Sequence, residues 1–196
     1  MKILNDIEEA VRYLKEGKII AYPTDTVYGL ACKLDKEALD NLKTRKHRPQ
    51  DKSLPIMVSD IKMMETIAYI NEKEKKIIEH FMPGAMTIVL NKKPQVEFWV
   101  NDSKDTLAIR QASDERIKEI IKRLNLPIFL TSANFSNEKV CENIKEIEEK
   151  GLADAGFDGM PLKQKASTIV MIKDDKAVIL REGPISQKEI EAVLNN

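Results

Sequence analysis

Short apolar runs alternate along this chain with stretches whose apolar residues recur at helical spacing, and this alternation limits the fold to a few classes. The apolar runs of strand length lie at residues 18–22, 54–58, 85–90, 106–110 and 127–131. Two further runs, residues 167–172 and 177–181, are separated by Lys173-Asp174-Asp175 and predict a hairpin. Strands that alternate with helices form layered α/β domains, and a hairpin adds an antiparallel pair. We therefore predict an α/β domain with a mixed sheet.

Several helix starts are marked by polar side chains that can accept backbone N–H groups. Asn71 is followed three residues later by Glu74, and Ser186 by Glu189, which is the spacing of a capping box. Ser113 precedes a stretch whose isoleucines recur at helical spacing. We predict Ser113 as the N-cap of that helix.

Length and composition fit one domain with its own core. The 196 residues contain no repeat, low-complexity segment or linker, so we predict a single domain over residues 1–196. The stretch 151–164 lacks periodicity and is predicted to be an irregular loop. Basic and acidic residues both number 32, so the formal net charge is zero. This balance argues against a surface built to coat nucleic acid or an anionic membrane, although it allows a local basic cleft.

The cysteines and histidines argue against a zinc site. Cys32 and Cys141 are far apart, neither belongs to a C-x-x-C pair, and His47 and His80 are the only histidines. The amino terminus lacks the apolar core of a signal peptide, and no apolar run approaches the roughly 18 residues that cross a bilayer. Two free thiols suit a reducing compartment, so we predict a soluble, cytoplasmic protein without a membrane partner.

Four predicted strands end abruptly in polar or charged residues. These ends are Thr24-Asp25-Thr26, Arg110, Thr131-Ser132-Ala133-Asn134 and Arg181. Ligands of α/β sheets collect beyond strand ends, where diverging elements leave a crevice. The arginine fork matches a carboxylate or a phosphate. Caps and turns explain any one cluster alone, but two arginines at strand ends favour a binding site.

A basic segment, "KTRKHRPQDKSLP" at residues 43–55, carries five cations within ten positions. These cations either complement the dipole at a helix end or clamp an anionic ligand, and the segment itself allows both interpretations. No G-x-x-x-x-G-K-[ST] or G-x-G-x-x-G motif is present, and no Ser/His/Asp or Cys/His set stands out. Pattern reasoning thus predicts an α/β domain with a polar crevice that favours anions.

Seven segments, in their order along the chain, resemble the YrdC-like family, the threonylcarbamoyl-AMP synthases of tRNA modification. They are "PTDTVYGL", "KHRPQDKSLP", "PGAMTIVL", "TLAIR", "TSANFS", "STIV" and "LREGPI". The resemblance runs from about residue 18 to residue 185, which is nearly the whole chain. The chain is similar to the short, single-domain members.

The resemblance implies a fold and a reaction. The fold is a twisted, open mixed sheet with flanking helices around a large concave cavity. The reaction converts L-threonine, bicarbonate and ATP into threonylcarbamoyl-AMP and pyrophosphate, with Mg²⁺. Separate threonylcarbamoyl-transfer proteins then modify adenosine 37 of tRNA, giving t6A, and the synthase itself could contact tRNA.

The resemblance also implies roles for ten residues. The threonine site would contain Thr26, Arg110 and Ser167. The cations around the triphosphate, where catalysis occurs, would be Lys46, Arg48 and Lys52. The remaining nucleotide contacts would come from Thr106, Ser132, Asn134 and Arg181, together with Arg48 and Lys52. Such chemistry depends on positioning and on cations facing the developing charge, which suits a site without an evident nucleophile.

Four positions depart from the family pattern. Ser53 stands where proline is usual, and Gln111 where a small apolar residue commonly follows the arginine. Met57 occupies a place where some relatives have histidine. Asn137 replaces a common glycine, which matters if that turn has a positive φ, although asparagine tolerates that conformation well. These departures put affinity and loop geometry in question more than the reaction.

Two alternatives remain open from the sequence. The first is an RNA-binding module that uses the basic cavity without making an adenylate. Neutral net charge and few aromatic residues argue against it. The second is a carbamoyl-transfer domain like that of hydrogenase-maturation proteins, but the acylphosphatase region and cysteine-rich motifs of those chains are missing.

Overall fold

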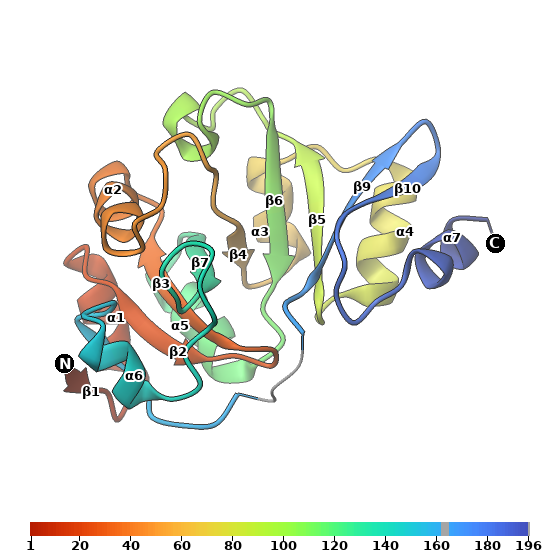
Figure 1. Ribbon diagram of the computed structural model, residues 1–196. Coiled ribbons are helices and arrows are strands. Elements are labelled where there is room, and N and C mark those ends of the chain that lie inside the picture. The colour runs from red at the N-terminus through yellow and green to blue at the C-terminus, as the bar shows by residue number, and fades with distance from the viewer. Residues whose placement is uncertain (162–164, 196) are drawn as a thin grey trace.

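The computed structural model describes residues 1–161 and 165–195, and it has one ten-stranded sheet with helices on both faces (Figure 1). The strands, in the order β1-β8-β2-β3-β7-β4-β6-β5-β9-β10, pair both parallel and antiparallel. The predicted α/β class with a mixed, open sheet is therefore confirmed. The strands are β1 (Lys2–Ile3), β2 (Ile20–Pro23), β3 (Tyr28–Lys33), β4 (Ile56–Val58), β5 (Met86–Asn91), β6 (Thr106–Gln111), β7 (Ile128–Ser132), β8 (Ala155–Gly156), β9 (Thr168–Lys173) and β10 (Lys176–Arg181).

Helices lie near both ends of the sheet. Figure 1 shows α1 and α6 at the end that holds β1, and α4 and α7 beside the β9–β10 hairpin at the other end. None of the helices in the described part of the chain is both long and apolar enough to span a membrane. The helices are α1 (Ile7–Lys15), α2 (Lys36–Arg45), α3 (Ile61–Ile67), α4 (Glu72–Phe81), α5 (Glu115–Leu124), α6 (Ile144–Glu149) and α7 (Gln187–Asn195), with a 3-10 turn η1 (Phe98–Asn101).

Strand β2 is apolar up to its closing proline because both of its faces are buried. Ile20 and Tyr22 of β2 pack with α1 and α5, whereas Ile19 and Ala21 belong to the core under α2, α3 and α4. Successive strand residues point to opposite faces, so a strand between two helical layers needs apolar residues at every position. This burial holds the end of the strand in place and so fixes the position of the polar residues that follow it.

Three short or polar strands differ from the prediction. β3 follows β2 after a tight turn, and its six residues include a glycine, a cysteine and a lysine, so its apolar pattern is weak. β8 lies inside the stretch predicted to be an irregular loop, and β1 has only two residues. β1 pairs with β8, and β8 pairs in turn with β2, and local sequence does not reveal these hydrogen bonds. The last three residues of the predicted loop, 162–164, lie outside the described residues.

Two of the predicted caps are confirmed and one is wrong. The Asn71 backbone N–H donates to Glu74 at 2.8 Å and the Glu74 backbone N–H donates to Asn71 at 2.9 Å, as a capping box requires. The Ser186 backbone N–H likewise donates to Glu189 at 2.8 Å. The helix after Ser113 is capped instead by Asp114, whose carboxylate accepts from two backbone N–H groups of the first turn.

Candidate substrate cavity

A cavity of about 240 Å³ gathers the polar strand ends. It lies where the β2–β3 turn, the end of β7, the middle of β6 and the ends of the β9–β10 hairpin meet. Six of the ten predicted site residues line it: Thr26, Arg48, Arg110, Ser132, Ser167 and Arg181. They come from six separate segments, so the structure brings together side chains that are far apart in sequence. A second hollow of about 360 Å³ shares Thr26 and Val27 with this cavity.

Arg110 is the most constrained cation of the cavity. Its Nη2 donates to both carboxylate oxygens of Asp25, at 2.7 and 2.6 Å, and its Nε donates to the Gly84 carbonyl at 2.9 Å. Its Nη1 makes only a long contact, 3.5 Å, with the Thr26 hydroxyl. Burial lowers the pKa of Arg110, and the charge and hydrogen bonds of Asp25 oppose that shift.

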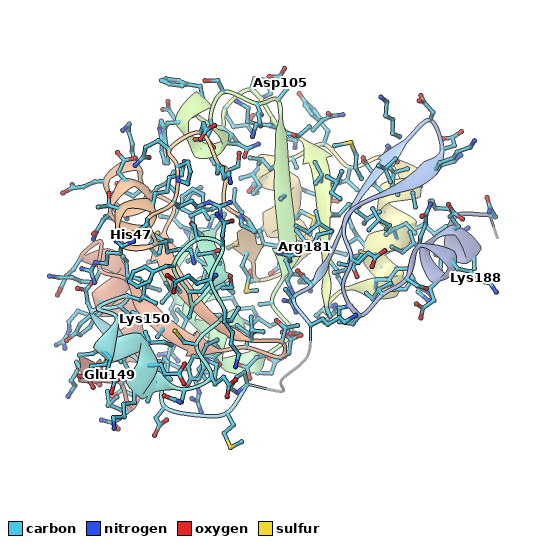
Figure 2. The ribbon with its side chains drawn as sticks, viewed as in Figure 1. His47, Asp105, Glu149, Lys150, Arg181 and Lys188 are labelled. Carbon is cyan, nitrogen blue, oxygen red and sulfur yellow. The ribbon has the colours of Figure 1, made fainter. Side chains whose placement is uncertain are left out.

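Arg181 and Ser167 form a second polar group on the far side of the cavity. The Arg181 Nε and Nη2 donate to the Ser167 carbonyl at 3.0 and 2.8 Å, and Nη2 also donates to the Ser167 hydroxyl at 3.0 Å. That hydroxyl lies 2.8 Å from the Thr87 hydroxyl, which also lines the cavity. Arg181 comes from the end of β10 and lies near the middle of the view in Figure 2.

Two cavity arginines have no carboxylate partner within 4 Å in the described part of the chain. Arg48 donates only to the backbone carbonyls of Lys52 and Ser53, at 3.1 and 2.6 Å, and Arg181 only to Ser167. Burial lowers the pKa of Arg48, and the charge of Asp102 opposes that shift; burial also lowers the pKa of Arg181, and the nearby charge of Arg110 lowers it further. Three cations and one carboxylate leave the cavity positive, so it favours an anionic ligand.

Among the five cations of the basic segment, only Arg48 lines the cavity. Lys43 is buried and pairs with Asp102 at 2.7 Å, and Arg45 pairs with Asp154 at 2.6 Å. Lys52 is exposed and is not among the lining residues. Lys43 and Arg45 of this segment therefore stabilise the fold, whereas Arg48 faces the cavity.

Lys46 does not line the cavity and instead binds Ser132 and Asn134 at the end of β7. Its ammonium donates to the Ser132 carbonyl at 2.5 Å, the Asn134 carbonyl at 2.7 Å and the Asn134 side-chain oxygen at 3.2 Å. Burial, and then the charge of Arg48, lower the pKa of Lys46 from its ordinary value of 10.5 to about 7. Three acceptors thus engage the ammonium, which ties the start of the basic segment to the end of β7.

Asn134 and Thr106 also lie outside the cavity lining. Asn134 is buried, accepts from the Ser132 hydroxyl at 2.7 Å and donates to the Glu138 carbonyl at 2.9 Å. It therefore orients Ser132, which does line the cavity. Thr106 begins β6, four residues before Arg110, a span of roughly 13 Å along a strand. The roles predicted for all ten site residues stay predictions, whether or not the residue lines the cavity.

The four departures from the family pattern have structural consequences. Asn137 has φ +69°, the left-handed conformation in which glycine is favoured and asparagine is tolerated. Ser53 and Met57 both line the cavity. The side-chain oxygen of Gln111 is buried and has no hydrogen-bond partner among the described residues.

Three residues that contact side chains of the cavity lining were given no individual role by the sequence reasoning. Asp25 holds Arg110, Thr87 contacts Ser167, and the Lys104 ammonium lies 3.1 Å from the hydroxyl of Ser53. Asp25 stands inside the conspicuous "PTDTVYGL" motif, so its position was a usable signal. Thr87 sits within an apolar strand and Lys104 in a polar loop, and neither pattern predicts a contact across the sheet.

Comparison with known proteins identifies the family. The family model Sua5_yciO_yrdC, described as "Telomere recombination", matches residues 12–183. The chain belongs to the Sua5/YciO/YrdC family. The resemblance seen in the sequence motifs is therefore confirmed.

Relatives within the family extend this result. The chain is 35% identical over 192 residues to a putative threonylcarbamoyl-AMP synthase of Methanocaldococcus jannaschii, covering 93% of this chain and 90% of that protein. It is 32% identical over 197 residues to the threonylcarbamoyl-AMP synthase of Bacillus subtilis, covering 96% of this chain and 56% of that protein. The crystal structure of P. abyssi Sua5 complexed with L-threonine has a TM-score of 0.90 and 30% identity, covering 98% of this chain and 61% of that one. The chain thus spans little more than half the length of the latter two relatives.

Proposed function

We propose that this protein is a threonylcarbamoyl-AMP synthase, a nucleotidyltransferase that acts in t6A modification of tRNA. One observation carries the proposal: six segments of a chain from this family converge on one positive cavity that is also lined by hydroxyl-bearing residues, among them Thr26, Thr87, Ser132 and Ser167. A positive, hydroxyl-rich cavity suits an amino acid carboxylate and the phosphates of ATP. The relatives named as synthases, and the Sua5 structure complexed with L-threonine, support this assignment.

The proposed threonine site is formed by Thr26, Arg110 and Ser167. Among the described residues, Nη1 of Arg110 makes a single long contact, so its N–H groups can donate to the carboxylate of threonine. The Thr26 and Ser167 hydroxyls can exchange hydrogen bonds with the polar atoms of the amino acid.

The proposed phosphate site is formed by Arg48 and Arg181, because their charges have no carboxylate partner among the described residues. Ser132 would contribute a hydroxyl there, with Lys46 and Asn134 keeping it oriented. In this scheme the amine of threonine and bicarbonate combine to give a carbamate with loss of water. The carbamate oxygen attacks the α-phosphorus of ATP, and the bond to the pyrophosphate oxygen breaks. The arginines offset the charge that develops on the leaving group.

Mg²⁺ would enter this scheme together with ATP. No group of three or more His, Cys, Asp or Glu residues that could hold a metal ion occurs within residues 1–161 and 165–195. Mg²⁺ at phosphoryl-transfer sites is commonly held by phosphate oxygens and water with few protein ligands. Contact with tRNA, hand-over to threonylcarbamoyl-transfer proteins and a cytoplasmic location are further parts of the proposal. The proposed single domain over residues 1–196 is supported by one sheet that runs from β1 to β10.

The test is pyrophosphate release by the purified protein. Release is expected only when ATP, L-threonine, bicarbonate and Mg²⁺ are all present, and it should fall sharply in Arg48→Ala. Arg123→Ala is the matched control, because Arg123 is an exposed arginine of α5 that pairs with Glu8 and Glu119. Release that ignores threonine or bicarbonate would refute the synthase. Tight RNA binding without any pyrophosphate would favour the RNA-binding module instead.

A further inference from the structure

We propose that Asp25 is a positioning residue that fixes the guanidinium of Arg110 so that one nitrogen, Nη1, stays directed into the cavity. The inference rests on the proposed function, because it assigns the Nη1 of Arg110 to the carboxylate of the amino acid substrate. Asp25 itself is not among the lining residues of the cavity. It acts on the ligand only through Arg110.

The contacts of Arg110 divide its three nitrogens between the protein and the cavity. Nη2 is committed to Asp25, with both carboxylate oxygens at 2.6–2.7 Å, and Nε is committed to the Gly84 carbonyl at 2.9 Å. Two fixed nitrogens determine the plane of the guanidinium, which is rigid. The third nitrogen, Nη1, points toward Thr26, a lining residue of the cavity.

The ion pair between Asp25 and Arg110 is largely buried, so its loss should disturb Arg110 strongly. The Arg110 side chain is 8% exposed and that of Asp25 is 23% exposed, so water competes little for the pair. Without Asp25, the charge of Arg110 would be buried with only neutral partners, in a cavity that already contains Arg48 and Arg181. Repulsion between cations would then favour other rotamers of the long arginine side chain. A loosened guanidinium loses the geometry that binding needs.

A competing interpretation makes the opposite prediction. If Asp25 only occupied Arg110 in place of a ligand carboxylate, its removal would release the arginine and tighten binding. The geometry argues for positioning, because Asp25 takes Nη2 and leaves Nη1 to the cavity side. The sign of the effect on threonine affinity therefore separates the two interpretations.

The first experiment measures L-threonine and ATP dissociation constants by calorimetry for wild type, Asp25→Ala, Asp25→Glu and the control Asp175→Asn. Asp175 lies in the β9–β10 turn, pairs with Lys73, and has a 75%-exposed side chain. Asp25→Ala should weaken threonine binding at least tenfold and change ATP binding less than threefold. Asp25→Glu should recover part of the loss, and Asp175→Asn should match wild type. Threonine binding that is unchanged or tighter in Asp25→Ala would overturn the proposal, as would equal losses for both ligands.

A double variant tests whether Asp25 acts through Arg110. In the Arg110→Ala background, Asp25→Ala should have little further effect on threonine binding, because the group it positions is gone. A full additional loss in that background would mean that Asp25 has another role and would overturn the proposal.

A measurement without ligand keeps this inference separate from the proposed function. In ¹⁵N NMR spectra of the unliganded protein, the Arg110 side-chain N–H groups should exchange slowly in wild type and fast in Asp25→Ala. Arg12, whose side chain is 63% exposed, provides the fast reference. If wild type fails to bind threonine but shows this protection, the proposed function fails while the positioning role stands. Equally fast exchange in Arg110 and Arg12 of the wild type would overturn the positioning role itself.

Discussion

Replacing Arg110 with alanine should weaken threonine binding far more than ATP binding. In the structure, Nη1 of Arg110 is held toward the cavity by the bonds of the other two nitrogens to Asp25 and Gly84. The substitution removes the donors proposed for the threonine carboxylate and leaves Arg48 and Arg181 in place. The two ligands should therefore respond differently.

The magnitude follows from the hydrogen bonds that the ligand would lose. A hydrogen bond to a charged group is worth about 1.5–3 kcal/mol. Loss of one such bond raises the dissociation constant about 10-fold to 140-fold, at about 1.4 kcal/mol per factor of ten, and loss of a second bond raises it further. The fold should survive, since the Asp25 carboxylate left behind is 23% exposed and can be hydrated. Typical stabilities of about 5–15 kcal/mol exceed the cost of about 1–3 kcal/mol expected for a lost buried partner.

The assay is separate calorimetric titration of L-threonine and of ATP, with thermal unfolding as the check on folding. Arg123→Ala provides a matched arginine on an exposed face. A threonine affinity within threefold of wild type, or equal losses for threonine and ATP, would refute the role derived for Arg110.

Three further predictions concern other residues of the site. Arg48→Ala should raise the dissociation constant for ATP about 10-fold to 100-fold and leave threonine affinity nearly unchanged, as charge-assisted contacts to phosphate are lost; calorimetry with both ligands checks this, and a threonine-only effect would contradict it. The pKa of Lys46 is lowered to about 7 in the folded state, so between about pH 7 and 10.5 the unfolded chain binds a proton that the folded chain releases, and stability should rise with pH. Between pH 7 and pH 9, the free energy of unfolding of wild type should rise by about 2 kcal/mol relative to that of Lys46→Met, as measured by denaturant unfolding. Parallel pH profiles of the two proteins would rule this out. At φ +69°, Asn137→Val should lower the free energy of unfolding by about 1–2 kcal/mol while Asn137→Gly stays within about 1 kcal/mol of wild type, and equal effects would show that the turn is not strained.

Part of the candidate site could be predicted from local sequence. Thr26, Arg110, Ser132 and Arg181 follow apolar runs, and burial of the runs in β2 and β7 fixes where Thr26 and Ser132 emerge. Asn137 shows the same logic at a turn, because its residue type already matches the left-handed conformation that the turn adopts. In both cases the information lies within a few residues along the chain.

Other parts depend on contacts between distant segments. β3 is weak as a local pattern and exists because it pairs with β2 on one side and β7 on the other. Lys46 and Arg48 are two residues apart, yet one turns inward to the carbonyls after β7 and the other faces the cavity. Charge alone could not separate a lysine that supports the site from an arginine that faces the ligand.

The amino-acid sequence by itself determined the α/β class, the family and the segments from which the site is built, because periodicity, caps and motifs are encoded over short stretches. Only the tertiary structure decided which charges are offset and which remain available to a ligand. Asp25 and Arg110 are 85 residues apart and meet at 2.6 Å, whereas Arg48 and Arg181 meet no carboxylate within the described residues. That balance arises from how the strands are ordered in the sheet, and strand order is a property of the whole fold.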